Sequence, residues 1–160
     1  MTATLTAPSR FVLGENDVVA FTVHGLPKPQ GSKVVRRHGD REWTQESSKA
    51  LPDWRRAVAG RAGDAMEGRP VLDQALALDV RFYMPRPKGH YGSGRNAHRL
   101  KDSAPIVPRT MPDLDKLVRA VCDAMTGVVW RSDADVVTIR AWKRYADSRS
   151  VGVDVRVGAA

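Results

Sequence analysis

Residues 112–137 read PDLDKLVRAVCDAMTGVVWRSDADVV, and this stretch carries the clearest structural signal in the chain. Its apolar side chains between residues 113 and 125 recur at the spacing of one helical face: Leu114, Leu117, Val118, Val121 and Met125. Asp113 follows a proline and suits the N-cap of this helix, and Gly127 suits the position just after its end. An apolar stretch begins at Val136, so the segment predicts a helix, a turn and a strand in succession.

Five aspartates lie in this same segment: Asp113, Asp115, Asp123, Asp133 and Asp135. A helix–turn–strand unit of this length can fold back and bring the two ends of the set together. Grouped carboxylate oxygens suit Mg²⁺, with Mn²⁺ as an alternative, because these hard cations keep several waters and accept phosphate oxygens. The structural alternative is that Asp113 caps the helix, Asp115 pairs with Arg119 one turn later, and the last aspartates form a turn.

Outward from this segment, hydrophobic periodicity predicts the other elements. A helix is expected over residues 47–67, because Trp54, Val58, Ala62 and Met66 form one stripe. Strands are expected over 18–24 and 75–84, and a short hairpin over 34–44. Residues 136–146 and 151–157 are expected to pair with each other as a second hairpin.

Strands on both sides of two helices predict a single α/β (α+β) domain, in which two main helices pack on a mixed β-sheet. We expect residues 1–17 to form a flexible N-terminal segment and residues 18–158 to form the domain.

No apolar run is long enough to cross a membrane, so no membrane partner is expected. Cys122 is the only cysteine, which excludes an internal disulfide and a cysteine-rich zinc site and fits a cytoplasmic protein.

The 160 residues carry 26 Lys and Arg against 18 Asp and Glu, a formal net charge of +8. Two glycine- and proline-rich segments together carry more than this whole excess, with net charges of +4 over residues 28–41 and +5 over residues 86–112, so the remainder of the chain is slightly acidic. Such a balance indicates a polyanionic partner, of which a nucleic acid is the usual kind. We therefore predict two basic loops at 25–43 and 86–112, whose candidate DNA contacts are Lys28, Lys33, Arg36, Arg37, Arg86, Lys88, Arg95, Arg99 and Lys101.

The order of residues in 112–137 resembles the signature of the RusA family of Holliday junction resolvases. The resemblance rests on PDLDKL, then RAVCDAMTG, then WRSDADVV, and it extends more weakly to residues 21–29, to Trp43-Thr44 and to residues 143–145. It implies a RusA-like fold and a homodimeric, Mg²⁺-dependent endodeoxyribonuclease that nicks four-way DNA junctions symmetrically during recombination and repair. It also suggests a phage or prophage setting.

Carried over by position, the metal-binding and catalytic aspartates are Asp113, Asp115 and Asp133. The catalytically important lysine of the family corresponds to Arg119, which keeps the charge but does not readily lose its proton. Lys116 stands where the family has asparagine and adds a cation, which we count among the candidate DNA contacts.

The roles of two aspartates stay open at this point. Asp123 either orients Arg119 or forms a surface ladder with Arg119 and Asp115. Asp135 either replaces an acid that the family has at Ser132 or only begins the strand. These departures leave a catalytically weak or silent branched-DNA-binding protein of the same fold as the alternative function.

Overall fold

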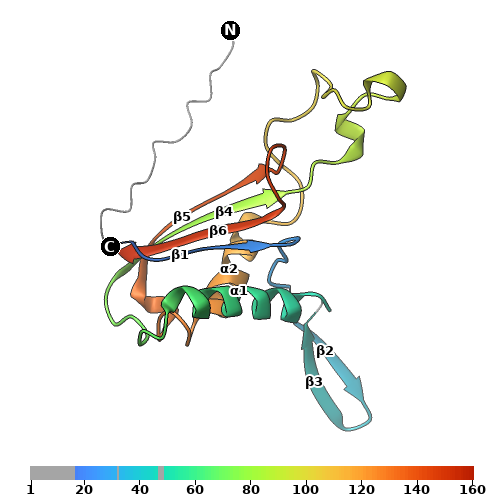
Figure 1. Ribbon diagram of the computed structural model, residues 1–160. Coiled ribbons are helices and arrows are strands. Elements are labelled where there is room, and N and C mark those ends of the chain that lie inside the picture. The colour runs from blue at the N-terminus through green and yellow to red at the C-terminus, as the bar shows by residue number, and fades with distance from the viewer. Residues whose placement is uncertain (1–16, 32, 47–48) are drawn as a thin grey trace.

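The computed structural model describes residues 17–31, 33–46 and 49–160. Its main sheet has four strands in the order β1-β6-β4-β5. The strands are β1 (Asp17–His24), β4 (Leu76–Met84), β5 (Val136–Tyr145) and β6 (Gly152–Ala159). Two helices, α1 (Leu51–Met66) and α2 (Leu114–Met125), lie on one face of this sheet (Figure 1). The predicted α+β domain with a mixed sheet and two packed helices is therefore confirmed.

The pairing of the last two strands differs from the sequence prediction. β4 lies between them, parallel to β5 and antiparallel to β6, and β6 also pairs antiparallel with β1. The expected hairpin of residues 136–146 with 151–157 is therefore wrong. The short link between the strands passes the end of β4, where the Ala146 amide donates to the Met84 carbonyl at 2.8 Å. β4 is buried along almost its whole length, as a central strand must be, and β5 is mostly exposed at the edge.

The core lies between the sheet and the helix layer. Alternate residues of the strands point toward the helices, among them Val19 and Phe21 of β1, Val80 and Phe82 of β4, and Val153 and Val155 of β6. The predicted α1 stripe of Trp54, Val58, Ala62 and Met66 is buried against them. Burying a side chain of this size contributes roughly 1.5–3 kcal/mol, so this alternation determines which face of the sheet receives the helices.

The two basic segments leave the body of the domain at one end. The first includes a projecting hairpin of β2 (Lys33–His38) and β3 (Arg41–Glu46), as the sequence predicted (Figure 1). The second contains two 3₁₀ turns, η1 (Lys88–His90) and η2 (Gly94–Asn96), and is closed by a hydrogen bond from the Lys101 amide to the His90 carbonyl at 2.9 Å.

The N-terminal segment predicted to be flexible lies, up to residue 16, outside the described residues. Within the described part of the chain, no helix has the length and apolar character needed to cross a membrane.

Candidate active site

A groove of about 710 Å³ lies between α2 and the edge strand β5. It is lined by Leu114, Asp115, Val118, Arg119, Cys122, Asp133, Val136, Ile139 and Ala141. Its walls are therefore mostly apolar, and its charged groups are the two carboxylates and one guanidinium predicted as site residues. The fold-back of helix, turn and strand brings Asp115 and Asp133 to one groove although 18 positions separate them.

Asp115 and Arg119 are one turn apart on α2, and both side chains are exposed in the groove. Among the described residues, Asp115 and Arg119 form no ion pair with each other, and neither forms an ion pair with another residue. The expected structural alternative, in which Asp115 is neutralised by Arg119, is therefore not what the structure contains. Asp115 lies in the first turn of α2, where a negative charge interacts favourably with the helix dipole.

Asp133 is positioned by two hydrogen bonds to the same oxygen. Its Oδ1 accepts from the Trp130 indole Nε1 at 2.9 Å and lies 2.7 Å from the Thr126 hydroxyl. Trp130 is fully buried, and Thr126 is the C-cap residue of α2, so both donors are anchored in the fold. This arrangement holds the carboxylate through Oδ1 and leaves Oδ2 available to a ligand in the groove. The sequence alone indicated no site role for Trp130, and its W-x-x-D spacing to Asp133 was the signal available.

Asp135 has a local structural role. Asp133–Asp135 form a 3₁₀ turn, η3, capped reciprocally: the Ser132 hydroxyl accepts from the Ala134 amide, and the Asp135 carboxylate accepts from the Ser132 amide. Of the two roles left open for Asp135, the structure favours building the turn that precedes β5.

Asp113, the third predicted metal ligand, does not line the groove. It is the N-cap residue of α2 but makes no side-chain cap, and its Oδ2 instead pairs with Lys116 Nζ at 3.0 Å. This contact raises the pKa of Lys116, so the ammonium stays charged beside the site.

The backbone before Asp113 is held by Lys143 of β5, whose Nζ donates to the Thr110 and Pro112 carbonyls, each at 2.8 Å. The described residues contain no group of three His, Cys, Asp or Glu side chains close enough to hold a metal ion.

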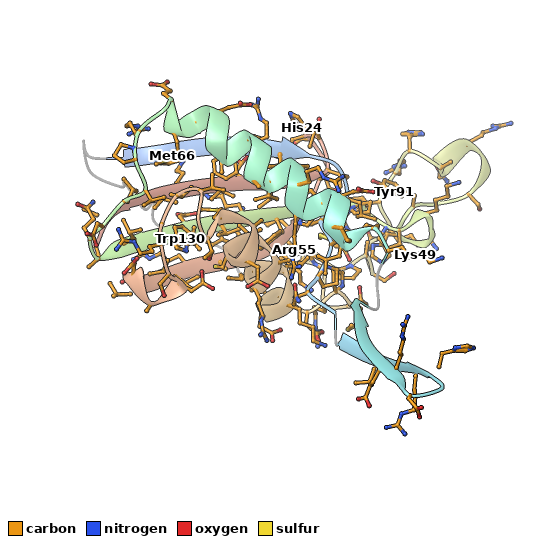
Figure 2. All side chains as sticks on the ribbon, turned by 90° about the horizontal axis from the view of Figure 1, so that it is seen from below. His24, Lys49, Arg55, Met66, Tyr91 and Trp130 are labelled. Atoms are coloured by element: carbon orange, nitrogen blue, oxygen red, sulfur yellow. The ribbon has the colours of Figure 1, made fainter. Side chains whose placement is uncertain are left out.

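Asp123 forms neither the ladder nor the contact with Arg119 that we considered. It pairs with Arg55 of α1 at 2.9 Å, and Arg55 also donates to the Gln30 side chain (Figure 2). The Gln30 amide in turn donates to the Lys116 carbonyl at 2.9 Å. Arg55 thus connects the start of the first basic segment to α2, a long-range contact that no local pattern indicated.

Cys122 also lines the groove but does not take part as a thiolate. Burial, with the nearby carboxylates of Asp133 and Asp123, raises the pKa of its thiol to about 12. The thiol therefore stays protonated at neutral pH and acts as a small apolar side chain of the groove wall.

The sequence of the chain matches the family model for endodeoxyribonuclease RusA over residues 24–157. The match runs from the end of β1 into β6 and includes the groove and both basic segments. The chain belongs to the RusA family. This membership implies endodeoxyribonuclease activity. The chain is also similar to the uncharacterized protein YqaN of Bacillus subtilis strain 168, with 29% identity over 146 residues that cover 88% of this chain and 96% of that protein.

The predicted DNA contacts of this RusA family protein differ in how exposed their side chains are and in what they contact. Lys88, Arg95, Arg99 and Lys101 are exposed on the projecting second segment, and Lys28 is half-buried near α2. Arg37 is exposed beside Glu42 on the hairpin, at 3.1 Å. The side chains of Lys33, Arg36 and Trp43 lie outside what the structure describes.

Arg86 has a different environment from the other predicted DNA contacts. Its guanidinium makes two hydrogen bonds to the Asp147 carboxylate, at 2.6 and 2.7 Å, and stacks over the Tyr145 ring. Only 6% of the side chain is exposed. Arg86 therefore fastens the second segment to the end of β5, and its donors are engaged within the protein in this structure.

The Trp130–Asp133 hydrogen bond leads to a first prediction. Trp130→Phe keeps an aromatic ring in the core but leaves Oδ1 with Thr126 alone, so we expect cleavage to fall roughly 10- to 100-fold, as when a ligand's orienting partner is lost. The divalent-metal concentration for half-maximal cleavage should rise as well, which a purely structural role would not require. Trp54→Phe is the matched control, because Trp54 is also buried but its indole nitrogen has no hydrogen-bond partner among the described residues. An unchanged dependence on the metal in Trp130→Phe would contradict the positioning role.

Proposed function

We propose that this RusA family protein is a Mg²⁺-dependent, structure-specific endodeoxyribonuclease that resolves Holliday junctions by paired symmetric nicks in DNA recombination and repair. The observation that carries the proposal is the convergence of Asp115, Asp133 and Arg119 in one groove of a strongly basic domain. A protein that only binds a polyanion gains nothing from exposed carboxylates in such a groove, because they repel phosphate.

The two carboxylates of the groove fit a divalent cation. Mg²⁺ is commonly held by one or two carboxylates, with waters and substrate phosphate oxygens completing its shell. The free Oδ2 of Asp133 and the unpaired carboxylate of Asp115 provide this donor set, which would also accept Mn²⁺. Bound Mg²⁺ would neutralise charge on the scissile phosphate and lower the pKa of the attacking water. Asp113 would join these ligands by exchanging its contact with Lys116.

The groove's own residues orient and stabilise the reacting phosphate. Arg119 donates hydrogen bonds to phosphate oxygens and holds positive charge where negative charge develops on the leaving 3′ oxygen. The apolar walls formed by Leu114, Val118 and Ile139 exclude part of the solvent, which strengthens these interactions. Asp133, held through Oδ1, keeps its second oxygen directed to the same place.

The two basic segments would provide further contacts with the DNA backbone. Exposed cations on both segments would contact backbone phosphates on either side of the cut, and each contact steepens the salt dependence of binding. Neither segment offers an α-helix to the major groove, because the first is a hairpin and the second is built of short 3₁₀ turns. This favours recognition of the shape of branched DNA over the reading of bases.

A homodimer would supply two grooves for paired nicks. β5 is the edge strand of the main sheet and exposes Val137, which does not line the groove, at 61%. A long edge strand with exposed apolar side chains favours association with a second copy, and two-fold symmetry matches a four-way junction.

The experiment that tests the proposal compares labelled four-way junction, linear duplex and single strand of the same sequence, each with Mg²⁺, Mn²⁺ or EDTA. We expect paired nicks in the junction with either metal and little cleavage of the other substrates. Tight binding of the junction without cleavage at any metal concentration would instead support the silent branched-DNA-binding protein.

The Asp113–Lys116 contact is the observation that favours the weakly active alternative, because it engages one predicted ligand with an internal cation. Lys116→Asn should release Asp113, lower the Mg²⁺ concentration for half-maximal cleavage about tenfold, and weaken DNA binding only slightly at physiological salt. Titration of cleavage rate against Mg²⁺ measures this. Lys49→Asn, at an exposed lysine outside the groove, is the control. A higher Mg²⁺ requirement in Lys116→Asn would show that the lysine supports the site.

A further inference from the structure

The face of the main sheet opposite the helices carries a concentration of arginines. Residues that alternate with the core positions point to this side, and no described helix covers it (Figure 1). The arginines are Arg81 of β4, Arg140 and Arg144 of β5, Arg156 of β6, and Arg149 in the link before β6. Asp79 and Asp154 are the acidic residues among them, so this open face is net positive. None of these arginines belongs to the two basic segments predicted to bind DNA.

A cavity of about 270 Å³ is hollowed into this open face. Three guanidinium-bearing side chains line it, Arg81, Arg149 and Arg156, together with Thr22, Asp79 and Asp154. Arg156 is exposed and makes no hydrogen bond or ion pair within the described part of the chain. Its donors are therefore available to an anionic ligand.

The other two arginines are held in place by their neighbours. Arg149 lies 3.0 Å from Asp154 and 3.9 Å from the centre of the Tyr83 ring. Arg81 Nε lies 3.4 Å from Asp79 Oδ1, and the guanidinium stacks 4.8 Å from the centre of the Trp142 ring. Stacked and paired guanidinium groups lose little conformational entropy on binding, which is the arrangement expected of a phosphate-binding site.

Asp79 is a buried acidic residue of the cavity wall. Its side chain is 1% exposed, on a sheet face that no described helix covers, and its Oδ1 lies near Arg81, while its Oδ2 has no hydrogen-bond partner among the described residues. In the register of the sheet Asp79 is opposite Arg140 of β5 and Arg156 of β6, so its negative charge lies among the arginines and offsets part of their mutual repulsion.

We propose that this open face binds backbone phosphates of a DNA arm other than the one being cut, with Arg156 and Arg149 as the contacts at the cavity. The proposal rests on the proposed function, since it assigns a second contact surface to the same branched substrate. The catalytic groove lies on the helix side of β5, and the open face lies on the other side of the sheet. One straight duplex cannot contact both faces, but two arms of a junction can. Contact with both faces therefore selects branched DNA.

The test measures the affinity of the full chain for a four-way junction and for a linear duplex of the same length, in Ca²⁺ to prevent cutting. Arg156→Ala should weaken junction binding roughly tenfold at 0.1 M salt and reduce the salt slope by about one, as expected for one lost phosphate contact. Duplex binding should change less than about threefold, because a duplex in the catalytic groove needs no contact with the open face. Arg156→Lys should restore most of the affinity. Arg56→Ala is the control, since Arg56 is an exposed arginine on α1.

Three outcomes would overturn the proposal. An equal loss for junction and duplex would mean that Arg156 contributes only to the general positive field. No loss for either substrate would mean that the open face does not touch DNA. Dissociation of a dimer by Arg156→Ala, measured by analytical ultracentrifugation, would mean that the face receives a second copy of the chain. Cleavage of the junction by the unmodified protein tests the proposed function separately, so failure of one proposal is distinguishable from failure of the other.

Discussion

Asp133→Asn is expected to abolish Mg²⁺-dependent cleavage of a four-way junction, by a factor on the order of 10³ or more, while the protein stays folded. A 10³-fold loss corresponds to about 4 kcal/mol of transition-state stabilisation. The amide oxygen of asparagine can still accept the hydrogen bonds from Trp130 and Thr126, so the turn keeps its geometry. What is lost is the negative charge of a carboxylate that lines the groove and on which the proposed metal site depends.

Junction binding without metal should persist in Asp133→Asn or tighten a few-fold, because one carboxylate no longer repels phosphate. Single-turnover cleavage and a binding titration in EDTA on the same preparation separate the two effects. Asp135→Asn is the matched control, since Asp135 belongs to the same turn but only accepts the Ser132 amide, which an asparagine side chain can also do. Normal cleavage by Asp133→Asn, or an equal loss in Asp135→Asn, would contradict the assignment of Asp133 to the reaction.

Local periodicity was sufficient for the helices and strands but not for their arrangement. The stripe from Trp54 to Met66 and the apolar face of 113–125 are spaced by the helix itself, so they are visible in the sequence. The order of strands depends on which strand is buried on both faces. β4 is buried along nearly all of its length, and this places it between β5 and β6 although a short link joins those two. Link length alone therefore suggested a hairpin that does not form.

The candidate site likewise has features that follow from local sequence and features that depend on tertiary contacts. The meeting of Asp115 and Asp133 followed from the length of the helix–turn–strand unit, which is a local property. Asp113 lies outside the groove and pairs with Lys116, an ion pair that the spacing of the aspartates did not indicate. The contacts of Arg55 with Asp123 and of Lys143 with the Pro112 carbonyl join residues that are distant in sequence. Such contacts depend on tertiary packing, and no periodic pattern reports them.

Arg119→Ala is expected to lower the rate of junction cleavage on the order of 10²-fold, with a smaller loss of binding, roughly tenfold or less. Arg119 is exposed in the groove, and among the described residues no carboxylate engages it, so its charge is available to the substrate. The rate should fall more than the affinity because the guanidinium acts where charge develops during bond cleavage. Arg131→Ala, at an exposed arginine that does not line the groove, should change the rate less than about threefold.

Arg119→Lys then separates charge from proton donation. An arginine keeps its proton throughout the accessible pH range, so any stabilisation of the leaving oxygen by Arg119 is electrostatic and independent of pH. A lysine at this position can also donate its proton, and that contribution is lost as the pH rises through the pKa of the ammonium group. We therefore expect Arg119→Lys to retain most of the activity at neutral pH and to lose rate at alkaline pH, where the unmodified protein does not. Identical pH–rate profiles for the two proteins, with Arg119→Ala as active as either, would show that this position does not act on the leaving group.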